Sequence, residues 1–164
     1  MVSELSANFT VQTTKGAGLN GDIGEMGPVD YLIVEWPGRQ PNGEAAPHLI
    51  DLVDRGLIRI IDLAFIAKDE DGNITRLEIA DLGDEVEAFA DFEGASAGLL
   101  SEDDTGEAAS ALEPGTSAAL LVYENLWAAP FASAVRSSGG QLVASGRIPV
   151  QDLIDALDAA EAAS

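Results

Sequence analysis

The sequence predicts a single α/β domain with a ferredoxin-like plan, in which two strand–helix–strand units share one sheet. Three observations favour this class. The length of 164 residues fits one domain. Short apolar runs rich in β-branched residues alternate with segments of helical period. The order strand, helix, glycine, strand then occurs twice, over 29–68 and over 117–147. We expect an added hairpin strand and two extra helices around these units.

The folded domain is expected to span residues 28–164. Residues 1–27 are rich in glycine, serine, threonine and asparagine and lack the period of a helix or strand. Such a composition buries little apolar surface, so we interpret 1–27 as a flexible N-terminal arm.

The first strand–helix–strand unit is predicted from its apolar runs and its stop signals. Residues 29–36 are apolar and β-rich, and Pro37 ends the strand. Residues 44–55 carry apolar side chains on one face of a helix, which Gly56 terminates. Residues 57–68 form the second predicted strand.

A hairpin is predicted to follow, because Asp69-Glu70-Asp71-Gly72 is turn chemistry and 73–81 form a third strand. With a loop of 69–72, Lys68 faces Asn73 and Ile66 faces Thr75. Both faces of the second strand are then apolar, which a sheet with one face in water does not show. We therefore expect the extra helices, another subunit, or both to cover the second face.

The second half repeats the pattern after a segment, 82–100, that predicts no clear element. Ser101 with Asp104 is a capping signal for a helix that runs to Leu112. The remaining predicted elements are a strand at 117–124, a helix at 126–138 that Gly139-Gly140 ends, a fifth strand at 141–147 and a last helix opened by Pro149.

The charge is strongly negative, with 29 acidic and 8 basic residues and a net value of −21. Such a field repels phosphate backbones and anionic lipid, so we expect neither nucleic acid nor membrane as partner. The acids are interpreted as a means of solubility or of adaptation to the host, with recognition of a basic partner as the alternative. There is no cysteine, no secretory signal and no apolar run of about 20 residues, which favours a cytoplasmic protein.

Four segments carry a resemblance to a known family: Gly27–Tyr31, Leu52–Arg59, Ala111–Leu120 and Gly139–Pro149. The chain resembles an actinobacterial family of unknown function, DUF family 6325, and is similar in layout to the larger DUF family 1269. The resemblance covers about residues 27–158 and implies no activity, cofactor or catalytic residue. The short, acid-interrupted segment Phe89 to Leu100 departs from the apolar hairpin of the larger family.

Two strings match catalytic or cofactor motifs without the context that the chemistry needs. Gly16-Ala17-Gly18-Leu19-Asn20-Gly21 has the spacing of a dinucleotide fingerprint, but no helix opens after it. Gly94-Ala95-Ser96-Ala97-Gly98 has the spacing of a nucleophile elbow, but no histidine follows it. We interpret the first as part of the arm and the second as a small-residue loop, and we expect no cofactor.

No metal site is expected either. His48 is the single histidine and lacks partners of the type that zinc needs. Asp69–Asn73 begins like a calcium loop, but the position of the bidentate acid is Ala80. A hairpin turn is the favoured interpretation of these residues.

The leading functional hypothesis is a non-catalytic module that self-associates or binds a protein partner, with enzyme activity left open. We expect a homo-oligomer, most simply a dimer, because three large apolar residues share the second strand and monomers rarely expose such patches. Those interface candidates are Ile61, Leu63 and Phe65. The alternative cover for them is the last helix.

The rival hypothesis is a small-ligand binder or enzyme that uses the sheet face or the crevice between helix and sheet. Asp62 lies in the middle of the second strand and, if buried, needs a partner such as Arg59, Arg76 or a helix-terminal amide. The ligand-binding candidates are Tyr31, Trp36, Arg59, Asp62, Arg76 and Trp127.

Overall fold

A computed structural model of the protein describes residues 25–38, 41, 43–77 and 100–164. The chain forms two units, Met1–Ala134 and Val135–Ser164. Most of the predicted arm and the segment 78–99 lie outside the described residues. Two of the motif matches, at 16–21 and 94–98, lie there as well.

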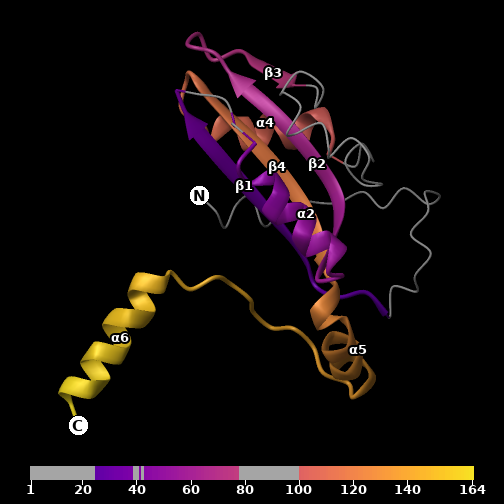
Figure 1. Ribbon diagram of the computed structural model, residues 1–164, viewed down its shortest axis with the longest axis vertical. Coiled ribbons are helices and arrows are strands. Elements are labelled where there is room, and N and C mark those ends of the chain that lie inside the picture. The colour runs from indigo at the N-terminus through magenta and orange to yellow at the C-terminus, as the bar shows by residue number, and fades with distance from the viewer. Residues whose placement is uncertain (1–24, 39–40, 42, 78–99) are drawn as a thin grey trace. The chain divides into compact units, whose positions relative to one another are not determined.

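The described strands form one four-stranded antiparallel sheet in the order β1-β4-β2-β3 (Figure 1). β4 lies at the centre, pairs with β1 on one side and β2 on the other, and has all ten residues buried. β1 and β2 therefore run parallel to each other with β4 between them. The strands are β1 (Val29–Pro37), β2 (Ile58–Lys68), β3 (Ile74–Leu77) and β4 (Thr116–Asn125). The predicted α/β class is confirmed.

The first strand–helix–strand unit is confirmed to within two residues at each boundary. Helix α2 (Ala46–Asp54) follows β1 and has a proline in its first turn, where a missing N–H costs nothing. Its end is a Schellman motif: Gly56 N–H donates to Val53 O at 2.9 Å and Leu57 N–H to Leu52 O at 3.0 Å. Gly56 has a φ of 67°, which a residue with a side chain rarely adopts.

The predicted hairpin forms, but its register is one residue away from the prediction. Lys68 pairs with Ile74, and Ile66 pairs with Arg76 instead of Thr75. The loop has five residues because Asn73 belongs to it. Asp69 accepts hydrogen bonds from both the backbone N–H and the side-chain amide of Asn73, at 2.8 and 2.9 Å. This is the hairpin turn that we favoured over a calcium loop.

Helix α4 (Glu102–Ser110) has the predicted start. Ser101 Oγ accepts from the Asp104 N–H at 3.1 Å, and Asp104 accepts from the Ser101 N–H at 2.9 Å, which completes a capping box. Lys68 at the end of β2 donates to Ala109 O and Leu112 O, at 3.1 and 2.9 Å. A cation there complements the negative end of the helix dipole.

Each face of the sheet has its own apolar core. α2 packs over the first, which contains Leu63 and Phe65 of β2 together with Leu121 of β4. α4 packs over the second, which contains Ile66 of β2 and Leu120 of β4. Figure 1 shows the two helices on opposite sides of the sheet. An extra helix therefore covers the second face, which is one of the two kinds of cover, helix or second subunit, that the sequence predicts.

A β-bulge in β2 corrects the predicted grouping of Ile61, Leu63 and Phe65. Ile60 pairs with Tyr123 and Asp62 with Val122, so Ile61 is an extra residue with no direct partner. The bulge moves Ile61 to the α4 side, whereas Leu63 and Phe65 lie on the α2 side. The three side chains do not share a face.

The second half of the chain differs most from the prediction. The predicted helix at 126–138 begins as the 3-10 turn η4 (Leu126–Ala128) and continues as α5 (Ala129–Ser137). The last helix, α6 (Val150–Ala162), is confirmed. The fifth strand predicted at 141–147 is wrong: these residues have no regular structure, and Leu142 and Val143 are 80% and 96% exposed.

The missing strand also removes the second strand–helix–strand unit. α5 was expected to share a face of the sheet with α2, but it contributes no buried residue. A run with β-propensity forms a strand when neighbours offer a pleated, half-buried surface. No described strand pairs with 141–147.

Candidate functional site

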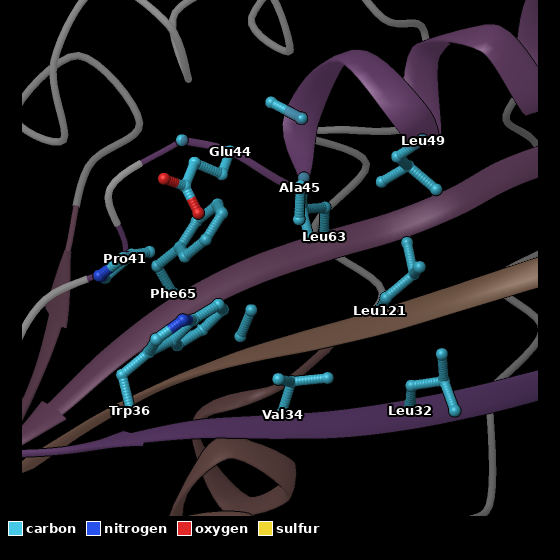
Figure 2. A pocket seen from close by; sticks show the side chains of 13 residues that line it. Leu32, Val34, Trp36, Pro41, Glu44, Ala45, Leu49, Leu63, Phe65 and Leu121 are labelled. Carbon is cyan, nitrogen blue, oxygen red and sulfur yellow. The ribbon is translucent and has the colours of Figure 1, made fainter.

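An apolar pocket of about 350 Å³ lies between the sheet and the start of α2. Figure 2 shows side chains from β1, β2 and β4 converging on it from one side, and the segment before α2 closing the other. All of its lining residues lie in the first unit. The lining residues are Leu32, Val34, Trp36, Pro41, Gly43, Glu44, Ala45, Ala46, Leu49, Leu63, Phe65, Ala119 and Leu121.

The strand pattern explains why the pocket exists. Alternate residues of β1, namely Leu32, Val34 and Trp36, point to the α2 side, because side chains in a strand alternate between faces. Small residues lie opposite them: Gly43, Ala45 and Ala46 at the start of α2, and Ala119 on the central strand. Large side chains on the edge strand and small ones around them leave the space open.

Among the described residues that line this pocket, Glu44 is the one with a charged side chain. It is exposed and immediately precedes Ala45, the N-cap residue of α2. In Figure 2 its carboxylate points toward the side of the pocket where Phe65 and Trp36 lie. The pocket therefore combines an apolar wall, two aromatic rings and one negative charge at its opening.

Of the six predicted ligand-binding residues, Trp36 lines this pocket. Tyr31 packs against the core on the α4 side of the sheet. Arg59 forms an ion pair with Glu124, its cross-strand neighbour on β4. Glu124 is almost fully buried and also accepts a hydrogen bond of 3.3 Å from the Gly27 N–H. The Arg59 contact is structural, since it neutralises a buried carboxylate.

The structure brings Asp62 and Arg76 together around the backbone of one residue, Leu100. Asp62 is completely buried and accepts from the Leu63 N–H at 2.8 Å and the Leu100 N–H at 2.7 Å. Arg76 Nη1 donates to Leu100 O at 3.4 Å. Leu100 precedes the N-cap residue of α4, so the partner of Asp62 is close to the helix-terminal amide that the sequence suggested. The arrangement anchors α4 to the sheet.

Trp127 lies in η4, 67% exposed, and its indole N–H donates to Asn125 Oδ1 at 3.2 Å. It does not line the pocket. The interface candidates Ile61, Leu63 and Phe65 are all buried within the chain. Large apolar side chains that are exposed include Val29 and Val34 of β1 and Val150, Leu153, Ile154 and Leu157 of α6.

Metal-binding geometry is not found among the described residues, which contain no group of three or more histidine, cysteine or acidic side chains placed to hold an ion. His48 is exposed on α2. The helices within the described ranges are all too short or too polar to cross a bilayer.

Sequence reasoning missed most of the pocket. The sequence places Glu44 and Leu49 within the helix predicted at 44–55 and gives neither a role in a site. No signal in the sequence brings Glu44 next to Trp36, because their proximity depends on the path of the chain between β1 and α2. The alternation of Leu32, Val34 and Trp36 was the signal that could have placed three lining residues on one face.

Comparison with known proteins identifies the family but no activity. No curated protein and no solved structure matches the chain significantly. A family model covers residues 25–163, which include the sheet, the pocket and the C-terminal helix. The chain therefore belongs to a family of unknown function, DUF6325.

Proposed function

We propose that the protein is a non-catalytic module that self-associates through the edge strand β1. The observation that carries the proposal is the sheet order: β1 pairs with β4 on one side, and it forms an edge of the sheet within the described chain. β1 is nine residues long, and its Val29 and Val34 are 45% and 46% exposed. A long apolar edge strand is a template for pairing with another chain.

Full overlap of the nine residues of β1 favours one register for a two-fold pairing of β1 with its copy. A register centred on Ile33 overlaps the whole strand and places Asp30 opposite Trp36 and Glu35 opposite Tyr31. The shift that pairs Ile33 with Leu32 would place Asp30 opposite Glu35, and like charges directly opposite each other are destabilising. We therefore propose the register in which Ile33 faces Ile33 of the second copy, as a closed two-fold contact requires.

Single cysteines test this register, because the chain has no cysteine of its own. In the proposed dimer, position 33 faces itself across about 4.5–5.5 Å, which a disulfide spans. Ile33→Cys should therefore form a disulfide-linked dimer on mild oxidation, whereas Val29→Cys, which faces Pro37, should not. The intact protein should have the mass of a dimer by light scattering. A monomer whose β1 amides resist hydrogen exchange would overturn the proposal, since another segment of the same chain would then cover the edge.

The wider setting is part of the same proposal. The arrangement of β1 and β2 around β4 is that of a split strand–helix–strand unit, which supports a ferredoxin-like plan for this half of the fold. We also propose that the protein is cytoplasmic and that it is a soluble relative of DUF family 1269. Its net charge of −21 supports the proposal that it binds neither nucleic acid nor membrane. We further propose an actinobacterial origin, on the resemblance of the four sequence segments.

Small-ligand binding is the second candidate function, and the α2-side pocket is the observation that favours it. Its volume lies at the lower end of the range of about 300–1,000 Å³ that small-molecule sites occupy. The pocket uses the face of β1 and the self-association uses its edge, so one chain has room for both. A shift in melting temperature on a panel of small apolar compounds tests whether the pocket binds anything.

A further inference from the structure

We infer that the edge-to-edge dimer joins the two α2-side pockets into one apolar trough, which holds a single long alkyl chain across the dimer axis. Ligand binding and self-association then stabilise each other. This inference rests on both proposed functions, self-association through β1 and small-ligand binding, and it names how the pocket regulates the dimer. Three features support it: the alternation of β1, the exposure of Val34 and the apolar lining.

The side chains of β1 that line the pocket also lie at the edge of the sheet. Leu32, Val34 and Trp36 line it from this strand, and Figure 2 shows them in a row along β1. β1 has β4 on one side and no described strand on the other. This wall of the pocket is therefore the part that comes closest to a second copy paired with β1.

The proposed register brings the walls of the two pockets together. With Ile33 opposite Ile33 of the second copy, Val34 lies opposite Leu32 of that copy, and Leu32 lies opposite its Val34. Directly opposite residues of an antiparallel pair point to the same face, with Cβ atoms about 4.5–5.5 Å apart. Both pockets therefore lie on one face of the continuous sheet and adjoin at these two pairs of residues.

Val34 shows that the pocket is open toward this junction. Its side chain lines the pocket and is 46% exposed. Leu63 and Leu121, which line the same pocket from the inner strands, are only 4% and 9% exposed. The apolar surface left in water therefore lies at the edge, where a second copy and a ligand that reaches it both remove it from water.

The shape and lining of the trough indicate an elongated apolar ligand. Leucine, valine, alanine and aromatic side chains form most of the wall of each pocket. The Trp36 positions of the two copies are about 20 Å apart along the strand direction, at roughly 3.4 Å per residue. A compact molecule occupies one pocket of about 350 Å³, whereas a long alkyl chain extends from one pocket into the other.

A chain that contacts both copies buries apolar surface that is available only in the dimer. Such a ligand binds the dimer more tightly than the monomer, and by linkage it shifts the equilibrium between them toward the dimer. A tenfold preference, which is about 1.4 kcal/mol, needs roughly 55 Å² of additional apolar burial at about 25 cal/mol per Å². Contact with Val34 and Leu32 of a second copy is enough to supply that area.

The Ile33→Cys variant provides a locked dimer that tests the inference, because position 33 lies on the opposite face of the strand from Leu32 and Val34. Dodecanol and hexanol are the probes, since they share a head group and differ in chain length. Dodecanol should bind the oxidised dimer about tenfold more tightly than the reduced, diluted monomer, at one molecule per dimer. Hexanol should bind both forms equally, to within about twofold. Calorimetry measures these affinities and the stoichiometry of dodecanol.

Val34 has a matched control on the same strand. Val34→Thr keeps the size of the side chain and places a hydroxyl at the junction, twice in each dimer. In the Ile33→Cys chain it should weaken dodecanol binding to the oxidised dimer about tenfold, more than it weakens hexanol binding. Val29→Thr makes the same change at a residue of similar exposure, 45%, on the opposite face, and should alter neither affinity by more than about twofold. An equal effect of the two substitutions would overturn the inference.

The remaining outcomes separate this inference from the proposals on which it rests. A folded Ile33→Cys chain that forms no disulfide dimer overturns the proposed self-association, and the inference with it. A dimer that binds neither alcohol overturns small-ligand binding, and again the inference. A dimer that binds dodecanol no more tightly than the monomer does overturns the inference alone. If Ile33→Cys folds poorly, the unmodified chain decides: dodecanol, but not hexanol, should keep it dimeric on dilution, as light scattering would show.

Discussion

The carboxylate of Asp62 accepts a hydrogen bond of 2.7 Å from the backbone N–H of Leu100, which ties the bulged part of β2 to the start of α4. The same carboxylate accepts from the Leu63 N–H at 2.8 Å. A completely buried acid that receives two backbone N–H groups is a structural element of the fold.

Replacing Asp62 by alanine should lower the free energy of unfolding by about 3 kcal/mol, because two buried N–H groups lose their acceptor at roughly 1–3 kcal/mol each. Urea denaturation measures the loss. Asp158→Ala, on an exposed position of α6, is the control and should change the value by no more than about 0.5 kcal/mol. Equal effects of the two substitutions would contradict a structural role for Asp62.

Local signals predicted the elements of the first unit well. The capping box of Ser101 and Asp104, the stop at Gly56 and the apolar runs of β2 and β4 all depend on residues close in sequence, and the structure has each of them. The run at 141–147 failed because a strand also needs a neighbour. A local pattern supplies the propensity but not the partner.

Long-range geometry accounts for the other differences. A single extra residue at Ile61 reverses the alternation of β2, and no turn or glycine marks it in the sequence. The Asp69–Asn73 hydrogen bonds lengthen the hairpin loop by one residue and shift its register. The pocket depends on the position of Glu44 relative to Trp36, which the chain between β1 and α2 determines.

Gly27 should tolerate no side chain. A Cβ at this position would lie 2.2 Å from the backbone oxygen of Asn125, so the backbone at Gly27 or at Asn125 would have to move. Gly27→Ala should therefore lower stability by about 1–3 kcal/mol, the usual cost of overpacking. Gly146→Ala is the matched control, because a Cβ there meets nothing within 4 Å. Similar melting temperatures for the two variants would show that Gly27 is not packed against Asn125.

The ion pair between Arg59 and Glu124 should matter more than the exposed pair between Arg55 and Asp51. Arg59→Met leaves the buried Glu124 carboxylate without its cation, and we expect a loss of about 2 kcal/mol. Removing one partner of a fully buried ion pair costs roughly 3–5 kcal/mol, but Arg59 is partly exposed. Arg55→Met should cost less than about 0.5 kcal/mol. Chemical denaturation of both variants gives the comparison, and the reverse order would refute it.

Hydrogen bonds from the side chain and backbone of Asn73 hold the pKa of Asp69 below its ordinary value. Because the pKa in the folded state is the lower one, the stabilisation is complete above the unfolded pKa. It disappears as the pH falls through the folded pKa. Asn73→Ala should raise the pKa of Asp69, as an NMR titration of its carboxyl carbon would show. Gln151→Ala, an exposed change on α6, should leave that pKa unaltered.

Stability should rise with salt, because a net charge of −21 disfavours the compact state by self-repulsion. Raising the ionic strength from dilute buffer to about 1 M shortens the screening length from roughly 30 Å to 3 Å and should raise the melting temperature by several degrees. Sodium chloride in a thermal melt is the simplest measurement. An unchanged melting temperature would mean that the acids are too widely spread to repel one another appreciably.

The bulge in β2 reverses the alternation of its odd and even residues between the two faces of the sheet. Residues before Ile61 and residues after it follow opposite odd–even rules, since Ile58 and Ile60 share a face with Leu63 and Phe65. Loss of Ile61 would restore strict alternation and leave every other side chain of β2 on its present side. Loss of Ala64 would turn Phe65 to the opposite core. Relatives with a β2 one residue shorter are therefore expected to lack Ile61, and an alignment that places the gap elsewhere in this strand would exchange the two cores.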